Sequence, residues 1–398
     1  MPVTYSEKAL QVRNSSTLAI TARAKALKAA GVDLVSFGAG EPNFPTPENI
    51  CDAAVAAIRG GKHGYTPVTG IPELKGAISH KFKEFNHIDY TPEQIVVSSG
   101  GKQCLSNAFQ AIINPGDEVI IPVPFWLSYP ELIRLCGGVP VFLQCNPENG
   151  YKVTPELIAG AVTERTKALV LNDPNNPTGA VYEEEELFAI GRLAVEKEFF
   201  IISDEMYEAL VYEGRKHVSI ASLSPEIFER TITVCGLSKS YAMTGWRMGY
   251  TGAPTELSRL MGNIQSHQAA NTCSITQAAA VEALAGSQEQ VKMMHDAFER
   301  RRRRMLERVR QMPHVTAMEG FGAFYVVVDF SELFGREYGG RLISDAADIG
   351  EILINDFNTV VIPCNDFGMP THIRLSYALS EEDIEKGLDR IESFLKKM

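Results

Sequence analysis

The sequence lacks the features that define several large functional classes. No run approaches the roughly 18 apolar residues of a membrane span, and the polar segment Met1–Arg13 has no apolar core of signal-peptide length. Seven cysteines are scattered without a C-x-x-C pair, and the eight histidines form no H-x-x-x-H or H-E-x-x-H cluster. We therefore expect a cytoplasmic protein with reduced thiols, no metal site and no membrane partner.

Positive charge is also in deficit. Lys and Arg total 38 against 49 for Asp and Glu, which gives a formal net charge of -11. Because nucleic-acid binding needs a basic face, this balance argues against a nucleic-acid partner. The chain also lacks the G-x-G-x-x-G turn of dinucleotide-binding proteins and the G-x-x-x-x-G-K-[ST] phosphate loop.

The centre of the chain alternates short apolar runs with helix-length segments. The apolar runs are Gln94–Ser98, Glu118–Pro122, Lys167–Leu171, Phe199–Ser203 and Thr231–Cys235. Such alternation is typical of an α/β fold in which helices cover both faces of a mostly parallel sheet. Ligands of these sheets bind at the carboxyl ends of the strands, so polar residues that follow the runs are candidates for a site.

The last third of the chain predicts a smaller α+β unit. Gln288–Gln311 carries an apolar stripe at helical spacing, and we expect its arginine run, Arg300–Arg304, to form a solvated, salt-bridged surface. Further segments predict strands at Phe324–Phe330, Thr359–Ile362 and His372–Tyr377, and part of a helix at Glu351–Asn355. We expect a large domain of residues 46–289 and a small domain of residues 1–45 and 290–398.

One loop carries the strongest chemical signal. Lys239 follows the last apolar run and is flanked by Leu237 and Ser238, and Arg247 comes eight positions later. An ordinary loop lysine is solvated, whereas a nucleophilic lysine needs an amine that loses its proton near neutral pH, which burial and nearby cations promote. Arginine supplies a bidentate clamp for phosphate. The stretch is thus suited to amine chemistry beside an anion.

This stretch resembles the cofactor-lysine signature of fold-type I, class I aminotransferases, the aspartate aminotransferase family, which use pyridoxal 5′-phosphate. Seven further motifs occur in the family's order and extend the resemblance over almost the whole chain. They are Ala39–Phe44, Gly64–Thr66, Ser99–Gln103, Pro124–Trp126, Asn175–Gly179, Ser203–Tyr207 and Ile373–Tyr377. The resemblance implies the fold-type I architecture, a mostly parallel sheet flanked by helices plus a smaller α+β domain.

The resemblance also implies catalytic and cofactor-binding roles. Lys239 would carry the cofactor as a Schiff base and act as general base, Asp204 would face the pyridine nitrogen, and Tyr207 would donate to the 3′-oxygen. The other implied cofactor positions are Gly100, Gly101, Lys102, Trp126, Asn176, Ser238, Arg247 and Tyr65. Trp126 would stack on the ring and Tyr65 would reach the cofactor phosphate of a neighbouring subunit, which implies a homodimer with shared sites.

Plainer interpretations of some of these residues exist. An aspartate after a strand is often a helix N-cap, and a tryptophan is often core. Gly100 and Gly101 before a helix suit either a simple turn or an anion site made of backbone N–H groups.

The implied substrates are an amino acid and a 2-oxo acid. Arg374 matches the residue that binds the α-carboxylate. Gly40, Trp126 and Asn176 match other positions on that side. In the subgroup that this chain most resembles, a distal carboxylate is bound at positions that match Lys102, Ser15 and Thr17. This trio favours L-aspartate or glutamate with oxaloacetate or 2-oxoglutarate, exchanged by a ping-pong mechanism.

Alternatives within the same fold stay open. The subgroup includes prephenate aminotransferases, and the segment Asp329–Gly335 and the insertion before Leu353 resemble the corresponding parts of those enzymes. Arg13 bears on the choice between aspartate and prephenate as substrates. A broader aromatic aminotransferase is a related alternative. Asn43 and Phe125, where the family usually has Asp and Tyr, touch the expected substrate side. A pyridoxal-phosphate-dependent carbon–sulfur lyase would share the lysine, the aspartate and the phosphate arginine.

Overall fold

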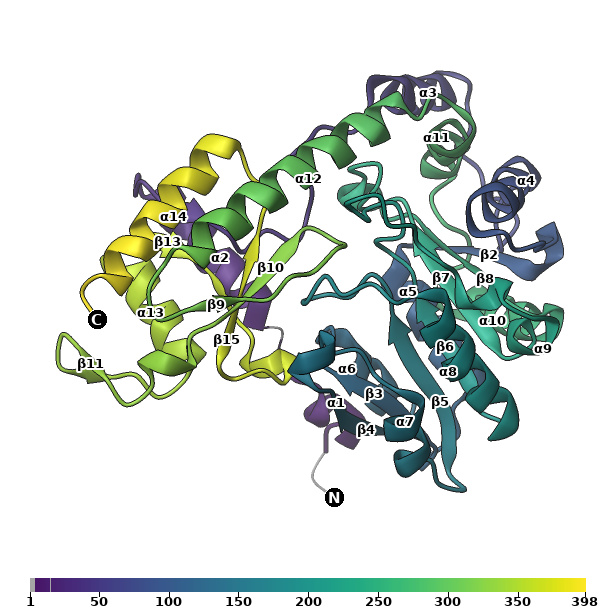
Figure 1. Ribbon diagram of the computed structural model, residues 1–398. Coiled ribbons are helices and arrows are strands. Elements are labelled where there is room, and N and C mark those ends of the chain that lie inside the picture. The colour runs from purple at the N-terminus through teal and green to yellow at the C-terminus, as the bar shows by residue number, and fades with distance from the viewer. Residues whose placement is uncertain (1–3, 15) are drawn as a thin grey trace.

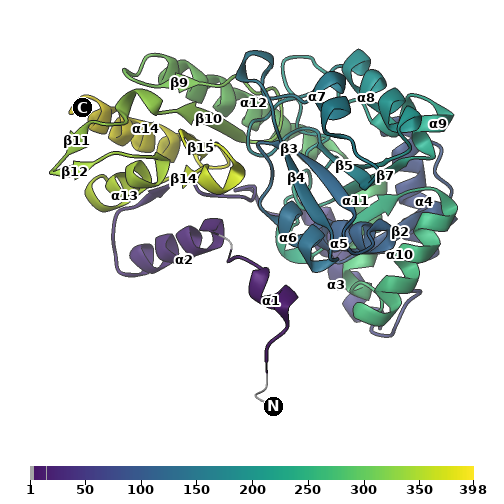
Figure 2. The same ribbon diagram turned by 90° about the horizontal axis from the view of Figure 1, so that it is seen from below.

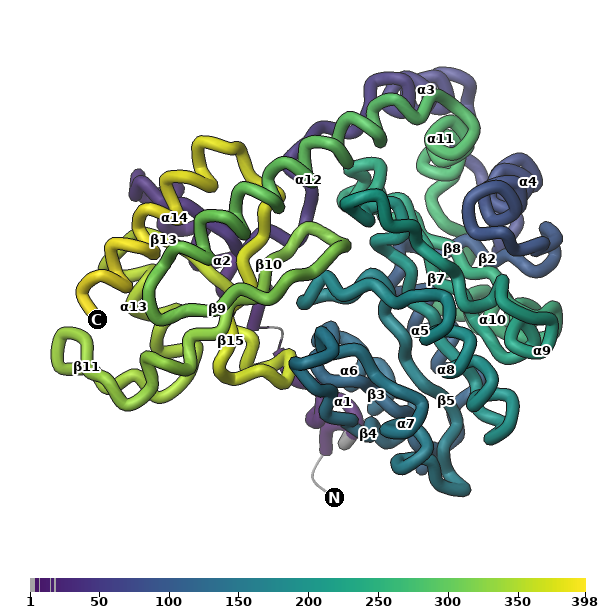
Figure 3. The backbone as a smooth tube through the Cα atoms, viewed as in Figure 1, coloured from purple at the N-terminus to yellow at the C-terminus, as the bar shows by residue number. Residues whose placement is uncertain are grey.

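The computed structural model describes residues 4–14 and 16–398. Figure 1 shows two groups of elements, and the long helix α12 (Glu289–Arg310) runs from one to the other. Figure 3 traces the same path as a continuous tube. Within the described ranges, no helix is long and apolar enough to cross a membrane.

A seven-stranded sheet forms the core of the larger group. Its strands are β2 (Ile95–Ser98), β3 (Glu118–Val123), β4 (Val139–Gln144), β5 (Thr166–Asn172), β6 (Phe200–Asp204), β7 (Thr231–Gly236) and β8 (Gly249–Gly252). They lie in the order β2-β8-β7-β6-β5-β3-β4. Only β8 is antiparallel to its neighbours, and the other pairs are parallel. The predicted mostly parallel sheet and its five apolar strands are confirmed.

Helices cover both faces of this sheet. One face packs on α5 (Gly101–Ile112), α6 (Ser128–Leu135) and α10 (Thr255–Gln268). The other face packs on α3 (Glu48–Arg59), α4 (Pro72–Lys81), α7 (Pro155–Ala161), α8 (Glu184–Glu196), α9 (Pro225–Phe228) and α11 (Ser274–Ala285). Both faces are therefore dry, which explains why the strands read as continuous apolar runs.

A smaller antiparallel sheet forms the core of the second group. Its strands, in the order β14-β15-β10-β9, are β14 (Ile362–Pro363), β15 (His372–Ser376), β10 (Tyr325–Asp329) and β9 (Thr316–Ala317). Side chains of α12, α13 (Ala346–Asp356) and α14 (Glu381–Leu395) pack on it in one apolar cluster. A hairpin of β11 (Glu337–Tyr338) and β12 (Arg341–Leu342) projects from this group. The predicted strands and helix of this region are present, with 359–362 divided between two short strands.

The N-terminal segment contacts both groups. Strand β1 (Val35–Ser36) pairs in parallel with β13 (Thr359–Val360), and α2 (Ser16–Ala29) is joined to α13 by the ion pair of Arg23 and Glu351. Helix α1 (Glu7–Gln11) instead lies beside α6 of the larger group, as Figure 2 shows. The pairing of β1 supports the predicted division at residues 45 and 290, which we keep as a proposal, but α1 departs from it.

The prediction that the arginine run of α12 forms a solvated surface is wrong for two of its five residues. Arg302 is only 1% exposed, donates to the carbonyl of Gly320 and pairs with Glu213. Arg301 is also buried and donates to the side-chain oxygen of Asn43 at 2.8 Å. The other three arginines of the run are exposed. Because α12 lies between the two groups of elements, more than one of its faces is covered.

Candidate active site

A cavity of about 450 Å³ lies at the carboxyl ends of the central strands, where the two groups of elements meet. The larger group contributes side chains that follow β3, β5, β6 and β7. The smaller group contributes residues of β10 and β15 and the segment 38–41. The strand ends gather the predicted residues at one edge of the sheet, as the parallel topology requires.

Lys239 sits in the turn after β7 and lines this cavity. Its Nζ atom donates a hydrogen bond to the carbonyl of Gly40. Burial, together with the nearby guanidinium groups of Arg374 and Arg247, lowers the pKa of Lys239 to about 8. The amine is therefore far easier to deprotonate than a solvated lysine, as a nucleophile or base requires.

Asp204 ends β6 and is 5% exposed. Tyr129 donates its hydroxyl proton to Oδ2 at 2.6 Å, and the backbone N–H of Met206 donates to Oδ1 at 3.2 Å. Burial raises the pKa of Asp204 to about 6, against the opposing effect of the Tyr129 bond. Residues 206–209 form a turn and not a helix, so the interpretation of Asp204 as a helix N-cap is wrong.

Arg374 projects from β15 into the same cavity and is 4% exposed. Its Nη1 donates to Oδ1 of Asn176 at 2.9 Å, and its guanidinium lies 4.2 Å from the ring centroid of Tyr325. Its Nε has no hydrogen-bond partner, and no acidic side chain within residues 4–14 and 16–398 pairs with it. A buried cation in this state is suited to binding a carboxylate that enters the cavity.

Tyr207 and Tyr325 also join the two groups of elements, as Asn176 and Arg374 do. Their hydroxyl oxygens lie 3.0 Å apart. Both side chains are buried, and both line the cavity. The bridge places phenol groups from β10 and from the turn after β6 against the same volume.

The start of α5 forms an anion cradle with Arg247. Gly100 has φ 86°, and a Cβ atom there would lie 2.5 Å from Nη2 of Arg247. A Cβ atom on Gly101 would lie 2.4 Å from Cε of Met206. Gly100 thus lets the Arg247 guanidinium approach the first turn of the helix, an arrangement that is suited to binding an anion.

Lys102 and Trp126 form the outer wall of the cavity. The Lys102 Nζ atom lies 5.1 Å from the Trp126 ring centroid. Burial lowers the pKa of Lys102, and the Arg247 charge lowers it further. Thr17 of α2 also lines the cavity, whereas Ser15 lies outside the described residues. Trp126 is partly exposed to the cavity, so it is not simply a core residue.

Several predicted positions lie elsewhere. Tyr65 is 96% exposed and does not line the cavity of its own chain. Asn43 binds Arg301, and Phe125 stacks on Phe142 with ring centroids 5.0 Å apart. The expectation that these two departures touch the substrate side is therefore wrong. Arg13 is exposed, and its backbone N–H donates to Glu131.

Other cavity residues were not predicted from the sequence. They are Thr21, Lys25, Glu41, Leu105, Leu127, Tyr129, Asn172, Thr244, Tyr325 and Phe367, among others. Tyr129 follows Trp126 by three positions at the start of α6, and this helical spacing was an available signal. Tyr325 and Phe367 have no comparable signal, because each reaches the cavity only through the packing of the smaller sheet.

The lining fits pyridoxal phosphate. A buried carboxylate without a cationic partner among the described residues, Asp204, suits a protonated pyridine nitrogen. The cradle of Gly100, Gly101 and Arg247 suits a phosphate, and the lowered pKa of Lys239 suits a covalent bond to an aldehyde. Such a lining defines an enzyme that handles amino groups with this cofactor.

Comparison with known proteins agrees with this geometry. The sequence matches the family described as "Aminotransferase class I and II" over residues 32–391. It is 44% identical to the aspartate aminotransferase of Bacillus sp. (strain YM-2), with 96% of each chain covered. It is also 44% identical to the aspartate/prephenate aminotransferase of Cereibacter sphaeroides, with 98% of each covered. The chain belongs to the class I and II aminotransferase family, whose members use pyridoxal phosphate.

A solved structure extends the likeness to three dimensions. The aspartate aminotransferase from Thermus thermophilus, determined with maleate, superposes with a TM-score of 0.93 at 43% identity. The superposition covers 99% of this chain and 100% of the other. The fold-type I architecture predicted from the motifs is thereby confirmed.

Proposed function

We propose that this aminotransferase exchanges the amino group between a dicarboxylic amino acid, L-aspartate or L-glutamate, and a 2-oxo acid by a ping-pong mechanism. The observation that carries the proposal is one cavity whose cationic side chains include three with separate tasks toward the substrate. Lys239 has an amine with a lowered pKa. Arg374 has a buried guanidinium group without an acidic partner among the described residues. Lys102 lies at the outer wall.

The proposed mechanism assigns each step to a side chain. Arg374, oriented by Asn176, binds the α-carboxylate of the substrate. Pyridoxal phosphate, when bound at Lys239, supplies an electron sink for the bond that breaks at the α-carbon. The Lys239 amine, with a pKa near 8, takes the α-proton and later returns it. Asp204 would stabilise a protonated pyridine nitrogen through its negative charge, which the Tyr129 hydroxyl helps to hold.

The remaining cofactor contacts follow from the same geometry. Arg247 and the start of α5 would hold the phosphate, with Gly100 and Gly101 giving it access to backbone N–H groups. The Ser238 side chain, next to the lysine, also lines the cavity. Trp126 would lie against the ring, and Tyr207 against its oxygen substituent. These assignments are proposals supported by the lining of the cavity.

The preference for a second carboxylate rests on the outer wall. Lys102 and Thr17 line the cavity on the side of α2 and α5. The related Thermus thermophilus enzyme was determined with maleate, a four-carbon dicarboxylate. A monocarboxylic amino acid would leave the lysine without an anionic partner, so we expect discrimination against it.

A half-reaction tests the proposal. The holoenzyme is mixed with L-aspartate alone, the cofactor absorbance is followed, and oxaloacetate is assayed. We expect loss of the starting absorbance band and one oxaloacetate per active site. L-alanine serves as the matched substrate without a second carboxylate, and Lys102→Ala should narrow the difference between the two amino acids. A sulfur amino acid such as L-cystathionine, offered without a 2-oxo acid acceptor, tests the alternative, because a carbon–sulfur lyase would cleave its carbon–sulfur bond and release ammonia, pyruvate and a thiol.

Prephenate is a second candidate acceptor. The Cereibacter sphaeroides relative is named an aspartate/prephenate aminotransferase. The segment that resembles that branch, Asp329–Gly335, lies outside the cavity lining, so the lining itself gives no separate support. Adding prephenate to the enzyme after its half-reaction with aspartate decides between the two acceptors, since only a prephenate aminotransferase restores the starting absorbance.

We also propose a cytoplasmic homodimer. The side chain of Tyr65 is almost fully exposed, and Val55 and Ile58 of the preceding α3 are 42% and 48% exposed. An aromatic ring in this state is suited to burial against a second copy of the chain. All seven cysteines are free, in keeping with a reducing compartment. Sedimentation at micromolar concentration tests the assembly, and Tyr65→Phe tests a contribution to the neighbouring site.

A further inference from the structure

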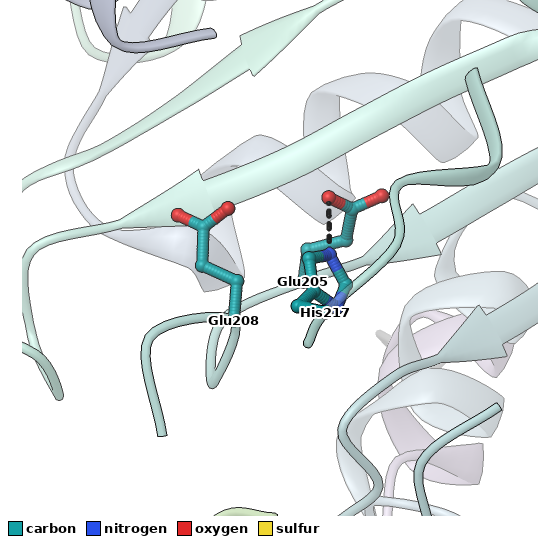
Figure 4. A group of neighbouring side chains, drawn as sticks. All are labelled: Glu205, Glu208 and His217. Atoms are coloured by element: carbon teal, nitrogen blue, oxygen red, sulfur yellow. Dashed lines mark hydrogen bonds and ion pairs between the residues drawn. The ribbon is translucent and has the colours of Figure 1, made fainter. Parts of the chain in front are cut away.

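The turn that follows Asp204 borders a largely buried cluster of charged and polar side chains from several elements. We call it the buried charge cluster, and its members are Lys81, Asn86, Asp173, Glu205, Glu208 and His217. Figure 4 shows Glu205, Glu208 and His217, with Glu205 and His217 joined by a hydrogen bond. These three side chains have ligand atoms within 4.8 Å of one another. None of the cluster takes part in the chemistry described above.

The contacts of Glu208 argue against a metal ion in this cluster. Lys81 donates to Oε1 of Glu208, and Asn86 donates to Oε2 at 2.7 Å. Both carboxylate oxygens are thus occupied, and the Lys81 ammonium already supplies a positive charge. The same amide of Asn86 also reaches Oε2 of Glu205 at 3.2 Å. The cluster is a network of protein groups, and its role follows from what it joins.

His217 lies between two carboxylates that belong to neighbouring strand ends. Its Nε2 is 2.9 Å from Oε2 of Glu205, which follows β6. Its Nδ1 is 3.7 Å from Oδ2 of Asp173, which follows β5. All three side chains are 2% exposed or less. Burial alone would lower the pKa of His217, but Glu205 and Asp173 raise it to about 9, so the ring is a cation at neutral pH.

The two strand ends that His217 joins carry the cavity residues. The backbone N–H of Asp173 donates to the carbonyl of Asp204 at 3.1 Å. The Asn172 side chain donates to the same carbonyl at 3.0 Å, and its Oδ1 accepts from the backbone N–H of Asn176 at 2.8 Å. Asn176 in turn holds Arg374. A shift of either turn therefore moves the Asp204 carboxylate or the substrate-binding arginine.

We propose that His217 is a positioning residue, whose contacts with Glu205 and Asp173 hold the turns after β5 and β6 in register and so fix Asp204 and Asn176 at the cavity. This inference rests on the proposed transamination. Without the imidazolium, Asp173 would hold a proton, since burial already raises its pKa to about 7, and the two carboxyl groups would lose the cation that joins the turns. Burying His217, Glu205 and Asp173 costs free energy, and in return their contacts fix the relative position of the two turns.

Three variants test this role. His217→Phe keeps the ring shape and removes both nitrogens, whereas His217→Gln keeps one N–H donor for Glu205. His295→Phe is the matched control, since His295 is a half-buried histidine whose Nε2 contacts the carbonyl of Val211 at 2.7 Å and touches neither turn. Each holoenzyme is assayed for kcat and KM with L-aspartate, for the pH midpoint of the cofactor absorbance, and for thermal unfolding.

For His217→Phe we expect kcat about tenfold lower or more, since small displacements of reacting groups have effects of this order. KM should rise as well, because a displaced Asn176 no longer holds Arg374 in place for the substrate carboxylate. The absorbance midpoint should move to higher pH, because a displaced Asp204 holds less positive charge on the cofactor and that charge favours loss of the proton on the Lys239 nitrogen. His217→Gln should recover part of both effects, and His295→Phe should show neither.

Unchanged kcat and midpoint in a folded His217→Phe, or equal losses in His295→Phe, would overturn the proposal. If His217→Phe does not fold, the midpoint of His217→Gln decides, and a wild-type value there overturns the proposal as well. The proposed function fails separately, when the wild-type enzyme forms no oxaloacetate from L-aspartate. The spectral midpoints of the variants still report on His217 in that case.

Discussion

Replacing Tyr129 with phenylalanine removes one oxygen atom from the cavity wall and tests how Asp204 is kept ionised. The Tyr129 hydroxyl donates to Oδ2 of Asp204 at 2.6 Å, and both side chains are buried. The pKa of Asp204 in this environment is about 6, because burial raises it while the Tyr129 bond lowers it. Loss of the bond leaves burial unopposed, so the pKa rises further.

The magnitude follows from the strength of such a bond. A hydrogen bond to a charged group is worth about 1.5–3 kcal/mol, and one pKa unit corresponds to about 1.4 kcal/mol. We therefore expect the pKa of Asp204 to rise by about one to two units in the cofactor-free Tyr129→Phe protein. Because the carboxylate form binds the protonated pyridine ring, cofactor affinity at pH 7 should fall about two- to tenfold through this effect.

The assay is a titration of the apoenzyme with pyridoxal phosphate, followed by absorbance between pH 5 and pH 9. The affinities of the variant and the wild type should agree near pH 9, where both carboxyl groups are ionised, and should separate increasingly as the pH falls below about 8. Tyr90→Phe is the control, since Tyr90 is equally buried but its hydroxyl contacts Thr233 at 3.1 Å. Identical pH profiles for Tyr129→Phe and wild type would refute the reasoning.

Three other variants address the remaining cavity groups. Lys239→Ala should abolish turnover, and borohydride should attach the cofactor covalently to the wild type but not to this variant; substantial turnover would contradict the assignment. Asp204→Asn should stabilise the apoenzyme by up to about 3 kcal/mol, which is the two-unit rise of a buried pKa from 3.8 to about 6. In urea unfolding this gain should be complete above pH 6 and shrink as the pH falls toward 4, and no gain at pH 8 would count against it. Arg374→Lys should lower kcat/KM for L-aspartate about 100-fold through the lost fork and the lost stacking on Tyr325, with cofactor affinity unchanged; an equal loss of cofactor affinity would place the arginine elsewhere in the mechanism.

The sequence alone was sufficient to predict the central sheet and the functional residues at the ends of its strands. Buried parallel strands have a distinct apolar pattern, and chain order then brings Asp204, Asn176 and Lys239 to one edge. The glycines before α5 were likewise readable, since their backbone requirement is local. The motifs thus predicted about half of the residues that line the cavity, although Ser15 lies outside the described residues and Tyr65 lies away from the cavity.

The rest depends on contacts between elements that are distant in sequence. Arg302 belongs to a run that looks solvated, and only the packing of α12 against the Glu213 and Gly320 loops buries it. His217 has no motif of its own, because its partners come from two different strand ends. The side chain of Asn43 also gave no sign that it would face Arg301 instead of the cavity.

The long helix has a mechanical consequence. A helix of 22 residues is about 33 Å long, and α12 is fastened near its middle, where Arg302 holds Glu213 and the carbonyl of Gly320. Its later turns bind α14 through Arg308 and Glu385. The contacts of Arg302 therefore fix one point along the helix, and a rotation about that point would move its first turn. A rotation of only ~5° about that point would displace the far end of the helix by ~1.5 Å. Displacements of about 1 Å can slow an enzyme reaction about 100-fold when they reach the reacting groups.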